Sequence, residues 1–198
     1  MNAPSARKRA APFAAAVLAG GRSSRFGSDK ALARWRGRRF LDHQLRLLRA
    51  LRPAQLIISG RPAVNYAVAD ATVVLDAVPG QGPLGGLAAV LAAATAPHVL
   101  VLAVDLPAMS RSFLRSLLAR RATGVGVVPR TAAGWEPLAA VYPREILPLV
   151  RRHLGGRRFA LHQLIDAGVA AGLLVEARMS GDRAGVFRNV NTPEDCAG

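Results

Sequence analysis

Short apolar runs alternate with segments of helical periodicity along most of this chain. The apolar runs predict strands at 13–19, 55–59, 72–75, 98–104, 124–128 and 137–142. The helical segments predict helices at 40–51, 84–95, 111–121, 145–153 and 160–167. The run at 98–104 has no polar alternation, which is typical of a strand buried on both faces. This alternation of strands and helices predicts an α/β fold with a mainly parallel sheet.

The composition indicates one folded domain. The chain has 198 residues, of which 51% are hydrophobic and 20% charged, and this balance excludes intrinsic disorder of the whole chain. We predict a disordered tail at 1–12 and a single domain at 13–198. The basic residues at 7–9 and the apolar run after them imitate a secretory signal. We interpret the run as the first buried strand instead, because cleavage there would remove the strand that leads into the glycine-rich loop at 18–30.

Cysteine usage and hydropathy bear on the compartment. The single cysteine, Cys196, excludes an intrachain disulfide and a cysteine-based metal cluster, and it favours a reducing compartment. No stretch approaches the roughly 18 apolar residues that span a bilayer. We therefore predict a cytoplasmic protein without a membrane partner.

The formal net charge of +15 raises the question of nucleic-acid binding. The arginines are dispersed, however, and the sequence has no arginine-rich tail, zinc-finger spacing or RNA-binding strand studded with aromatic residues. We predict no nucleic-acid partner, although a basic binding module without catalysis remains an alternative. A positive field would also attract a small polyanionic substrate.

A loop rich in glycine, hydroxyl groups and positive charge follows the first predicted strand. It reads Leu18-Ala19-Gly20-Gly21-Arg22-Ser23-Ser24-Arg25-Phe26-Gly27-Ser28-Asp29-Lys30. Glycines directly after a buried strand let backbone amides approach an anion, while the serines, arginines and Lys30 supply hydroxyls and charge. The loop is not a Walker A motif, because Gly27 is followed by Ser-Asp-Lys. We predict that it binds a polyphosphate.

A second glycine loop, at 76–86, supports a different interpretation. Gly80, Gly82 and Gly85 have the G-x-G-x-x-G spacing of a dinucleotide-binding site, and Asp105 lies twenty residues beyond. Four residues separate the preceding strand from Gly80, where that site needs a tight turn, and Pro83 removes one amide from the helix start. This loop is therefore ranked second to the loop at 18–30, and an NAD(P)-binding reductase that uses it is a further alternative.

Asp105 follows the apolar run at 98–104, so its carboxylate is expected at the carboxyl edge of the sheet, where ligands of such folds bind. A Mg²⁺ held mostly by phosphates and water needs one or two protein oxygens of this kind. A turn cap before Pro107 is the structural alternative. The chain has no Gly-x-Ser-x-Gly elbow and no motif for a nucleophile and base, so covalent hydrolase chemistry is not expected.

Five motifs, taken in order over about residues 13–197, resemble the molybdenum cofactor guanylyltransferases. They are Leu18-Ala-Gly-Gly-x-Ser-x-Arg-Phe-Gly-x-Asp-Lys30, Gly82-Pro-Leu-x-Gly-Leu87, Asp105-x-Pro107, Glu136-Pro-Leu138 and Asn189-Val-Asn-Thr-Pro-Glu-Asp195. The resemblance implies a three-layer α/β/α sandwich with a mainly parallel, Rossmann-like sheet of the nucleotide-diphosphosugar transferase type. It also implies Mg²⁺-dependent transfer of GMP from GTP to the phosphate of molybdenum–molybdopterin, with release of pyrophosphate.

The same resemblance implies partners and site residues. The partners are GTP, the molybdopterin cofactor, and possible upstream cofactor-insertion proteins and recipient molybdoenzymes. The expected nucleotide-binding residues are Leu18, Ala19, Gly20, Gly21, Arg22, Ser23, Lys30, Ser59, Asp76 and Asp105. Lys30, Arg25 and Asp105 are expected to act in catalysis, and Asp105 with Asn191 to hold the metal. Ser59 stands where the family often carries Asn.

Related transferases remain alternatives within the same fold. A cytidylyltransferase for the same cofactor usually has Leu-Ala-Ala-Gly where this chain has Leu-Ala-Gly-Gly, so the extra room at Gly20 favours guanine. Another NTP:phosphate nucleotidyltransferase is also compatible with the first loop. For the pterin, the segments 159–167 and 136–142 are candidates, and Arg157 and Arg158 are more readily explained as solvated surface residues.

Overall fold

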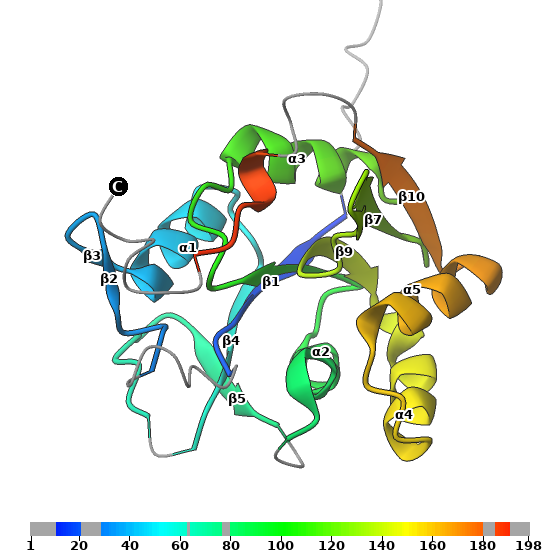
Figure 1. The fold of residues 1–198 in the computed structure, drawn as a ribbon, viewed down its shortest axis with the longest axis horizontal. Helices are drawn as coiled ribbons and strands as arrows, with labels where there is room; N and C mark the ends of the chain where they lie inside the picture. The colour runs from blue at the N-terminus through cyan, green and yellow to red at the C-terminus, as the bar shows by residue number, and fades with distance from the viewer. Residues whose placement is uncertain (1–10, 21–28, 63, 77–79, 180–184, 191–198) are drawn as a thin grey trace, which may run out of the picture.

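The computed structural model describes residues 11–20, 29–62, 64–76, 80–179 and 185–190. Within these residues the fold is built around one eight-stranded sheet (Figure 1). Its strands are β1 Phe13–Leu18, β4 Gln55–Gly60, β5 Thr72–Leu75, β6 His98–Ala103, β7 Gly126–Thr131, β8 Gly134–Trp135, β9 Ala139–Pro143 and β10 Leu174–Arg178. The order is β10-β7-β9-β6-β1-β4-β5, with β8 paired to β7.

The sheet is mixed, because β8 and β9 run antiparallel to the strands that they pair with. The pairs β1–β4, β1–β6, β4–β5 and β7–β10 are parallel, whereas β9 is antiparallel to both β6 and β7. The prediction of a mainly parallel sheet is confirmed. The carboxyl ends of the four consecutive parallel strands, β6, β1, β4 and β5, consequently meet along one edge.

Helices cover both faces of the sheet. They are α1 Phe40–Arg49, α2 Gly82–Ala93, α3 Arg111–Arg120, α4 Leu147–Gly155 and α5 Leu161–Ala170, with a 3₁₀ turn at Arg144–Ile146. One core cluster joins the sheet to α1 and α3, and a second joins it to α2, α4 and α5 (Figure 1). The three-layer α/β/α architecture expected from the family resemblance is therefore confirmed.

Strand β1 shows why the pattern produces these layers. Ala15 and Val17 belong to the cluster under α1 and α3, while Ala14, Ala16 and Leu18 belong to the cluster under α2. Alternate side chains of a strand point to opposite faces, so a wholly apolar strand is the one that is covered twice.

Helix α2 is apolar around its whole circumference. Its sequence, GPLGGLAAVLAA, contains no charged residue, and it packs between the sheet and α4. A helix that is covered on more than one side has no need of a polar face. The second glycine loop leads directly into this buried helix.

Four strands were not predicted: β8 and β10 of the main sheet, and the two short strands of a separate hairpin. The edge strand β10 has only Leu174 and Ala177 buried, so its sequence lacks the continuous apolar run of the central strands. The hairpin of β2 Arg34–Trp35 and β3 Arg38–Arg39 turns at Arg36 and Gly37, which both have positive φ. This turn suits a two-residue hairpin, but the arginine-rich segment carries no apolar strand signal.

No helix among the described residues is both long and apolar enough to cross a membrane.

Candidate active site

The site is assembled at the sheet edge where β6, β1, β4 and β5 end. Leu18, the last residue of β1, is paired with Ser59 of β4 on one side and with Ala103 of β6 on the other. Gly20 lies two residues beyond β1, Asp76 directly follows β5, and Asp105 lies two residues beyond β6. Parallel pairing therefore brings together residues that are far apart in sequence.

Lys30 and Asp105 form an ion pair at this edge. Lys30 Nζ lies 3.3 Å from Asp105 Oδ2, and the two side chains are 12% and 26% exposed. The Lys30 backbone is part of a turn in which the amides of Leu32 and Ala33 donate to the Asp29 carbonyl. The pair places a cation and a carboxylate side by side, both within reach of solvent.

The turn that carries Lys30 is anchored by a tyrosine that the sequence analysis did not identify. The hydroxyl of Tyr66, a residue only 2% exposed, donates to Asp29 Oδ2 at 3.4 Å and accepts from the Arg61 amide at 2.9 Å. Asp29 Oδ1 accepts from the Ala31 amide. Burial is the main cause that raises the pKa of Tyr66, which keeps the hydroxyl protonated. Tyr66 lies in a segment without regular structure, so no motif or periodicity marks it.

Ser59 and Asp76 meet beside the end of β1. The Ser59 hydroxyl donates to Asp76 Oδ1 at 3.4 Å, and the Ser59 carbonyl accepts from the Ala19 amide at 2.8 Å. Burial raises the pKa of Asp76, and the Ser59 hydroxyl partly offsets this by stabilising the carboxylate. The structure thus brings two of the expected nucleotide-binding residues into contact with each other.

Backbone groups at the start of the first loop are hydrogen-bonded to neighbouring strands. The Ala19 amide bonds Ser59, and the Leu18 carbonyl accepts from the Val104 amide at 3.2 Å. Leu18 and Ala19 are 8% and 2% exposed, whereas Gly20 is only half-buried. Gly20 is therefore the first residue of this loop that is open to a ligand. Gly21, Arg22, Ser23, Arg25 and Asn191 lie outside the described residues.

Two neighbouring segments border Asp105. The Asp105 carbonyl accepts from the Val190 amide at 3.1 Å, and the Phe187 ring packs edge-to-face on Phe113 of α3 at 5.3 Å. The segment after β8 also approaches, because the Leu138 carbonyl accepts from the Ala103 amide at 2.7 Å. These bonds bring the Asn189-Val190 and Glu136-Pro-Leu138 motifs to the Asp105 end of the edge.

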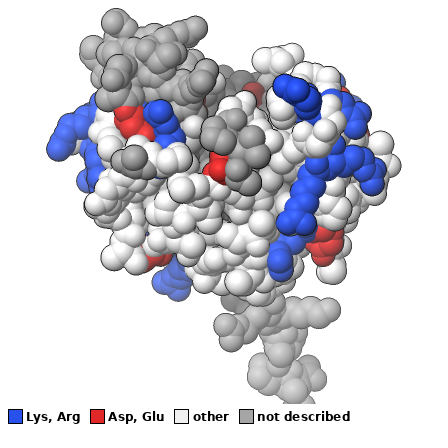
Figure 2. Space-filling view, turned by 90° about the horizontal axis from the view of Figure 1, so that it is seen from below, with Lys and Arg blue, Asp and Glu red and all other residues white. Residues whose placement is uncertain are grey.

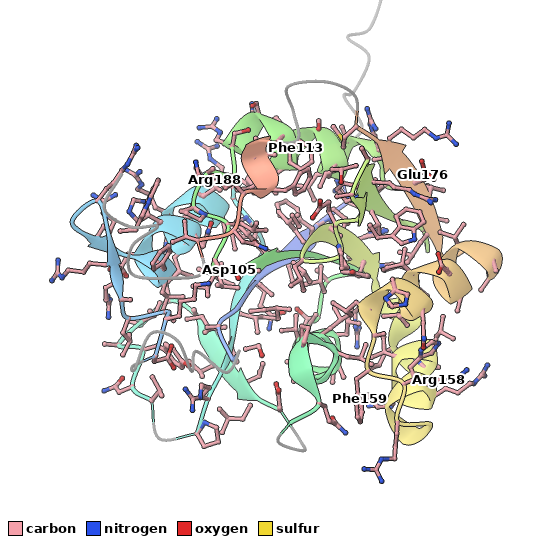
Figure 3. The ribbon with its side chains drawn as sticks, in the orientation of Figure 1. Asp105, Phe113, Arg158, Phe159, Glu176 and Arg188 are labelled. Atoms are coloured by element: carbon pink, nitrogen blue, oxygen red, sulfur yellow. The ribbon has the colours of Figure 1, made fainter. Side chains whose placement is uncertain are left out.

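Arg157 and Arg158 are not part of this assembly. Figure 3 places Arg158 and Phe159 beside α4, across α2 from Asp105. Both arginines are exposed, and Figure 2 shows Lys and Arg side chains gathered along the side of the molecule where α4 lies. This position agrees with their interpretation as solvated surface residues.

Within the described ranges, no group of three or more His, Cys, Asp or Glu side chains has the geometry of a metal cluster. His98 is 3% exposed, and its Nε2 donates to the carbonyls of Ala122 and Val125, so it packs rather than binds a ligand. Asp105 and Asp76 are both carboxylates at this sheet edge, and a cation bound mainly through phosphates needs one or two protein oxygens of this kind.

Residues 15–171 match the family described as MobA-like NTP transferase domain. The chain is 36% identical over 189 residues to a probable molybdenum cofactor guanylyltransferase from Opitutus terrae, and the match covers 94% of each chain. It is 38% identical over 190 residues to a protein of the same description from Deinococcus radiodurans, covering 94% of this chain and 93% of that one.

Solved structures share the fold at lower identity. The molybdopterin-guanine dinucleotide biosynthesis protein A from Archaeoglobus fulgidus superposes with a TM-score of 0.71 at 20% identity, over 92% of this chain and 94% of that one. A Mycobacterium tuberculosis protein solved in complex with manganese superposes with a TM-score of 0.65 at 23% identity, over 87% and 90% of the two chains.

Proposed function

The chain belongs to the MobA-like NTP transferases, and from this premise we propose that it transfers GMP from GTP to the phosphate of molybdenum–molybdopterin. The products are molybdopterin guanine dinucleotide and pyrophosphate. The guanylyltransferases of Opitutus terrae and Deinococcus radiodurans support this assignment through their similarity over nearly the whole chain. A cytoplasmic location, and contacts with proteins that supply the pterin or accept the product, belong to the same proposal.

The observation that carries the proposal is the ion pair between Lys30 and Asp105. Lys30 ends the glycine-rich loop after β1, and Asp105 follows β6, so the pair joins the two segments that the sequence assigns to phosphate and metal. A reductase that used the Gly80–Gly85 loop for a dinucleotide would have no use for this arrangement. The pair therefore favours phosphoryl chemistry at the carboxyl edge of the sheet.

The reaction needs positioning and charge stabilisation more than covalent catalysis. An oxygen of the pterin phosphate attacks the α-phosphorus of GTP, and the bond from this phosphorus to the oxygen that bridges it to the β-phosphate breaks as pyrophosphate leaves. The attacking phosphate is already ionised, so no general base is required. The Lys30 ammonium stabilises negative charge on the phosphates, and Asp105 holds that ammonium in place.

Asp105 fits the metal role expected for it. Its carboxylate is partly exposed at the strand end, where a Mg²⁺ bound mainly through phosphate oxygens and water would take one or two protein ligands. When bound, the ion would supply positive charge to phosphate oxygens. Asn191 is proposed as a second ligand from its sequence motif alone.

Gly20 is the residue that we assign to the choice of base. A Cβ built on Gly20 would lie 3.5 Å from the Gly60 carbonyl oxygen, an ordinary contact, so the described protein has room for a methyl group there. Packing within the described residues therefore does not explain the glycine. We attribute the glycine at position 20 to the extra room that the larger purine base needs.

Calorimetric titration with GTP and Mg²⁺, with CTP and NADH as competitors, tests the assignment. We expect selective binding of GTP that Mg²⁺ strengthens, followed by formation of the dinucleotide when molybdenum–molybdopterin is supplied. Preference for CTP would keep the chemistry but change the product. Binding of NADH without GTP would overturn the proposal.

A further inference from the structure

We propose that Ser59 is a positioning residue, which holds the Asp76 carboxylate for the nucleotide and does not touch the nucleotide itself. This inference rests on the proposed binding of GTP and deepens it. It also revises the expectation from sequence, in which Ser59 takes the place of a nucleotide-contacting Asn.

The Ser59 side chain is enclosed by protein. The residue is 1% exposed, and its Oγ would lie only 2.6 Å from a Cβ built on Gly86 and 3.8 Å from one built on Gly20. The hydroxyl therefore sits directly against the backbone of α2. A ligand outside the sheet edge has no route to it unless these elements separate.

The enclosed hydroxyl has a partner that does reach the surface. It donates to Oδ1 of Asp76, a residue that is only half-buried. Since Oδ1 is engaged by Ser59, we assign the second oxygen, Oδ2, to a donor of the nucleotide. Ser59 thus acts on the ligand through the orientation of this carboxylate.

Two glycines of α2 form the surface on which the carboxylate rests. A Cβ on Gly85 would lie 3.1 Å from Asp76 Oδ2, and one on Gly86 would lie 3.5 Å from Oδ1. Side chains at these positions would press on the carboxylate or on the hydroxyl that holds it. The Gly85-Gly86 pair and Ser59 therefore together hold the Asp76 carboxylate in position.

The charge of Asp76 depends on the same contact. Among the described residues, β1, β4, β5 and α2 contribute no ionisable side chain, and burial and the Ser59 hydroxyl are the two causes that shift the pKa of Asp76. Burial raises the pKa of Asp76, and the hydroxyl lowers it. Loss of the hydroxyl would raise this pKa further and leave less carboxylate at mildly acidic pH.

A double-mutant cycle on the full chain tests the inference, with the Kd for GTP in the presence of Mg²⁺ as the readout. Ser59→Ala should weaken binding about tenfold, the order expected for a hydrogen bond to a charged group. The same substitution in an Asp76→Ala background should cause no further loss. Ser116→Ala is the matched control, because its hydroxyl bonds the Phe113 carbonyl in α3, away from the site.

Two further readouts separate positioning from a merely structural role. In Ser59→Ala, the loss of GTP binding on acidification should begin at higher pH than in the wild type. Gly86→Ala, which leaves Ser59 in place but displaces its hydroxyl, should weaken GTP binding in the same way. This variant also covers the case in which Ser59→Ala does not fold.

The outcomes of these experiments distinguish failure of the inference about Ser59 from failure of the proposed function. Failure of the wild-type protein to bind GTP would overturn the proposed function. GTP binding with additive losses in the cycle would mean that Ser59 contacts the nucleotide directly, and an unchanged Kd in Ser59→Ala would mean that the hydroxyl has no role. Either of these last two results overturns the inference and leaves the proposed function standing.

Discussion

Lys30 Nζ lies 3.3 Å from Asp105 Oδ2, although 75 residues separate them along the chain. The contact exists because β1 and β6 are parallel neighbours, so the loops that follow them emerge at the same edge. Both side chains keep partial exposure, which suits groups that meet a charged ligand. The pair is the structural centre of the proposed site.

Lys30→Ala should reduce guanylyl transfer by a factor of about 100 or more, the usual effect of removing one group that stabilises transition-state charge. The fold should persist, since the Asp105 carboxylate left behind is partly exposed to water. Transfer is measured with GTP, Mg²⁺ and molybdenum–molybdopterin, and the fold by thermal unfolding. Arg49→Ala, which breaks the exposed pair with Asp70 at the end of α1, is the control and should transfer normally. Normal transfer by Lys30→Ala would refute the assignment.

Gly20→Ala should change the choice of nucleotide without harming the fold. The added methyl makes only ordinary contacts with the described protein, so its effect falls on the ligand. We expect GTP affinity to fall about tenfold or more, the scale of discrimination by one methylene-sized group, with little loss of CTP affinity. Calorimetry with both nucleotides checks this, and an equal loss for the two would contradict the role of Gly20 in base choice.

Gly60→Ala is the matched control for that experiment. A Cβ there would lie 2.4 Å from Tyr66 Cε2, inside the contact distance of any real pair. The crowding should lower the free energy of unfolding by about 1–3 kcal/mol, the usual range for overpacking. Urea unfolding of the two alanine variants should therefore separate a ligand effect at Gly20 from a packing effect at Gly60.

Tyr66→Phe should weaken the turn that carries Lys30. The variant removes the hydroxyl that bonds both Asp29 and the Arg61 amide, at a cost of about 1–3 kcal/mol for groups left unsatisfied. GTP binding and transfer activity should fall together with thermal stability. Tyr142→Phe removes a hydroxyl that bonds the Pro137 carbonyl instead, so it should lower stability while GTP binding is retained. Loss of GTP binding in both variants to the same degree would argue against a specific role for Tyr66.

Glu136→Gln should change how stability depends on pH. Burial is the main cause that raises the pKa of Glu136 above its ordinary 4.5, and the Thr131 hydroxyl offsets part of the rise. As pH increases past 4.5, the unfolded chain releases this proton first, so stability falls until the pH exceeds the raised value in the folded protein. The glutamine variant lacks this decline.

Urea unfolding from acid to neutral pH measures the difference between the two proteins. The wild type should lose stability relative to Glu136→Gln over that window and then remain at a constant offset. Glu145→Gln, at an exposed position on the 3₁₀ turn, is the control and should follow the wild type. Parallel curves for wild type and Glu136→Gln would show that burial of Glu136 has no such consequence.

The three central parallel strands and the edge strand β5 were predictable because their apolar signal is local. The runs at 13–19, 55–59, 72–75 and 98–104 were predicted as strands, and β1, β4, β5 and β6 differ from them by at most one residue at an end. The signal failed where charged residues interrupt the apolar run, as in β10, or where a turn conformation dominates, as at Arg36-Gly37.

The residue types of the site were also visible in the sequence. A glycine-rich loop after a buried strand indicates phosphate binding, and a carboxylate at the end of another strand indicates metal binding. Each signal is a short stretch of consecutive residues, so it is visible without the tertiary structure. The residue patterns alone therefore determined the α/β class of the fold and the loops that carry polar groups, whereas the three layers and the class of reaction were implied by the resemblance to the guanylyltransferases.

Only the tertiary structure decided which of these residues touch. Strand order brings Lys30 to Asp105 and Ser59 to Asp76, and the antiparallel β9 lies beside β6. The enclosure of Ser59 and the anchoring of Asp29 by Tyr66 arise from packing between segments distant in sequence. A hydrophobic pattern states which face of an element is buried, but it does not state against which partner, and that choice determines the geometry of the site.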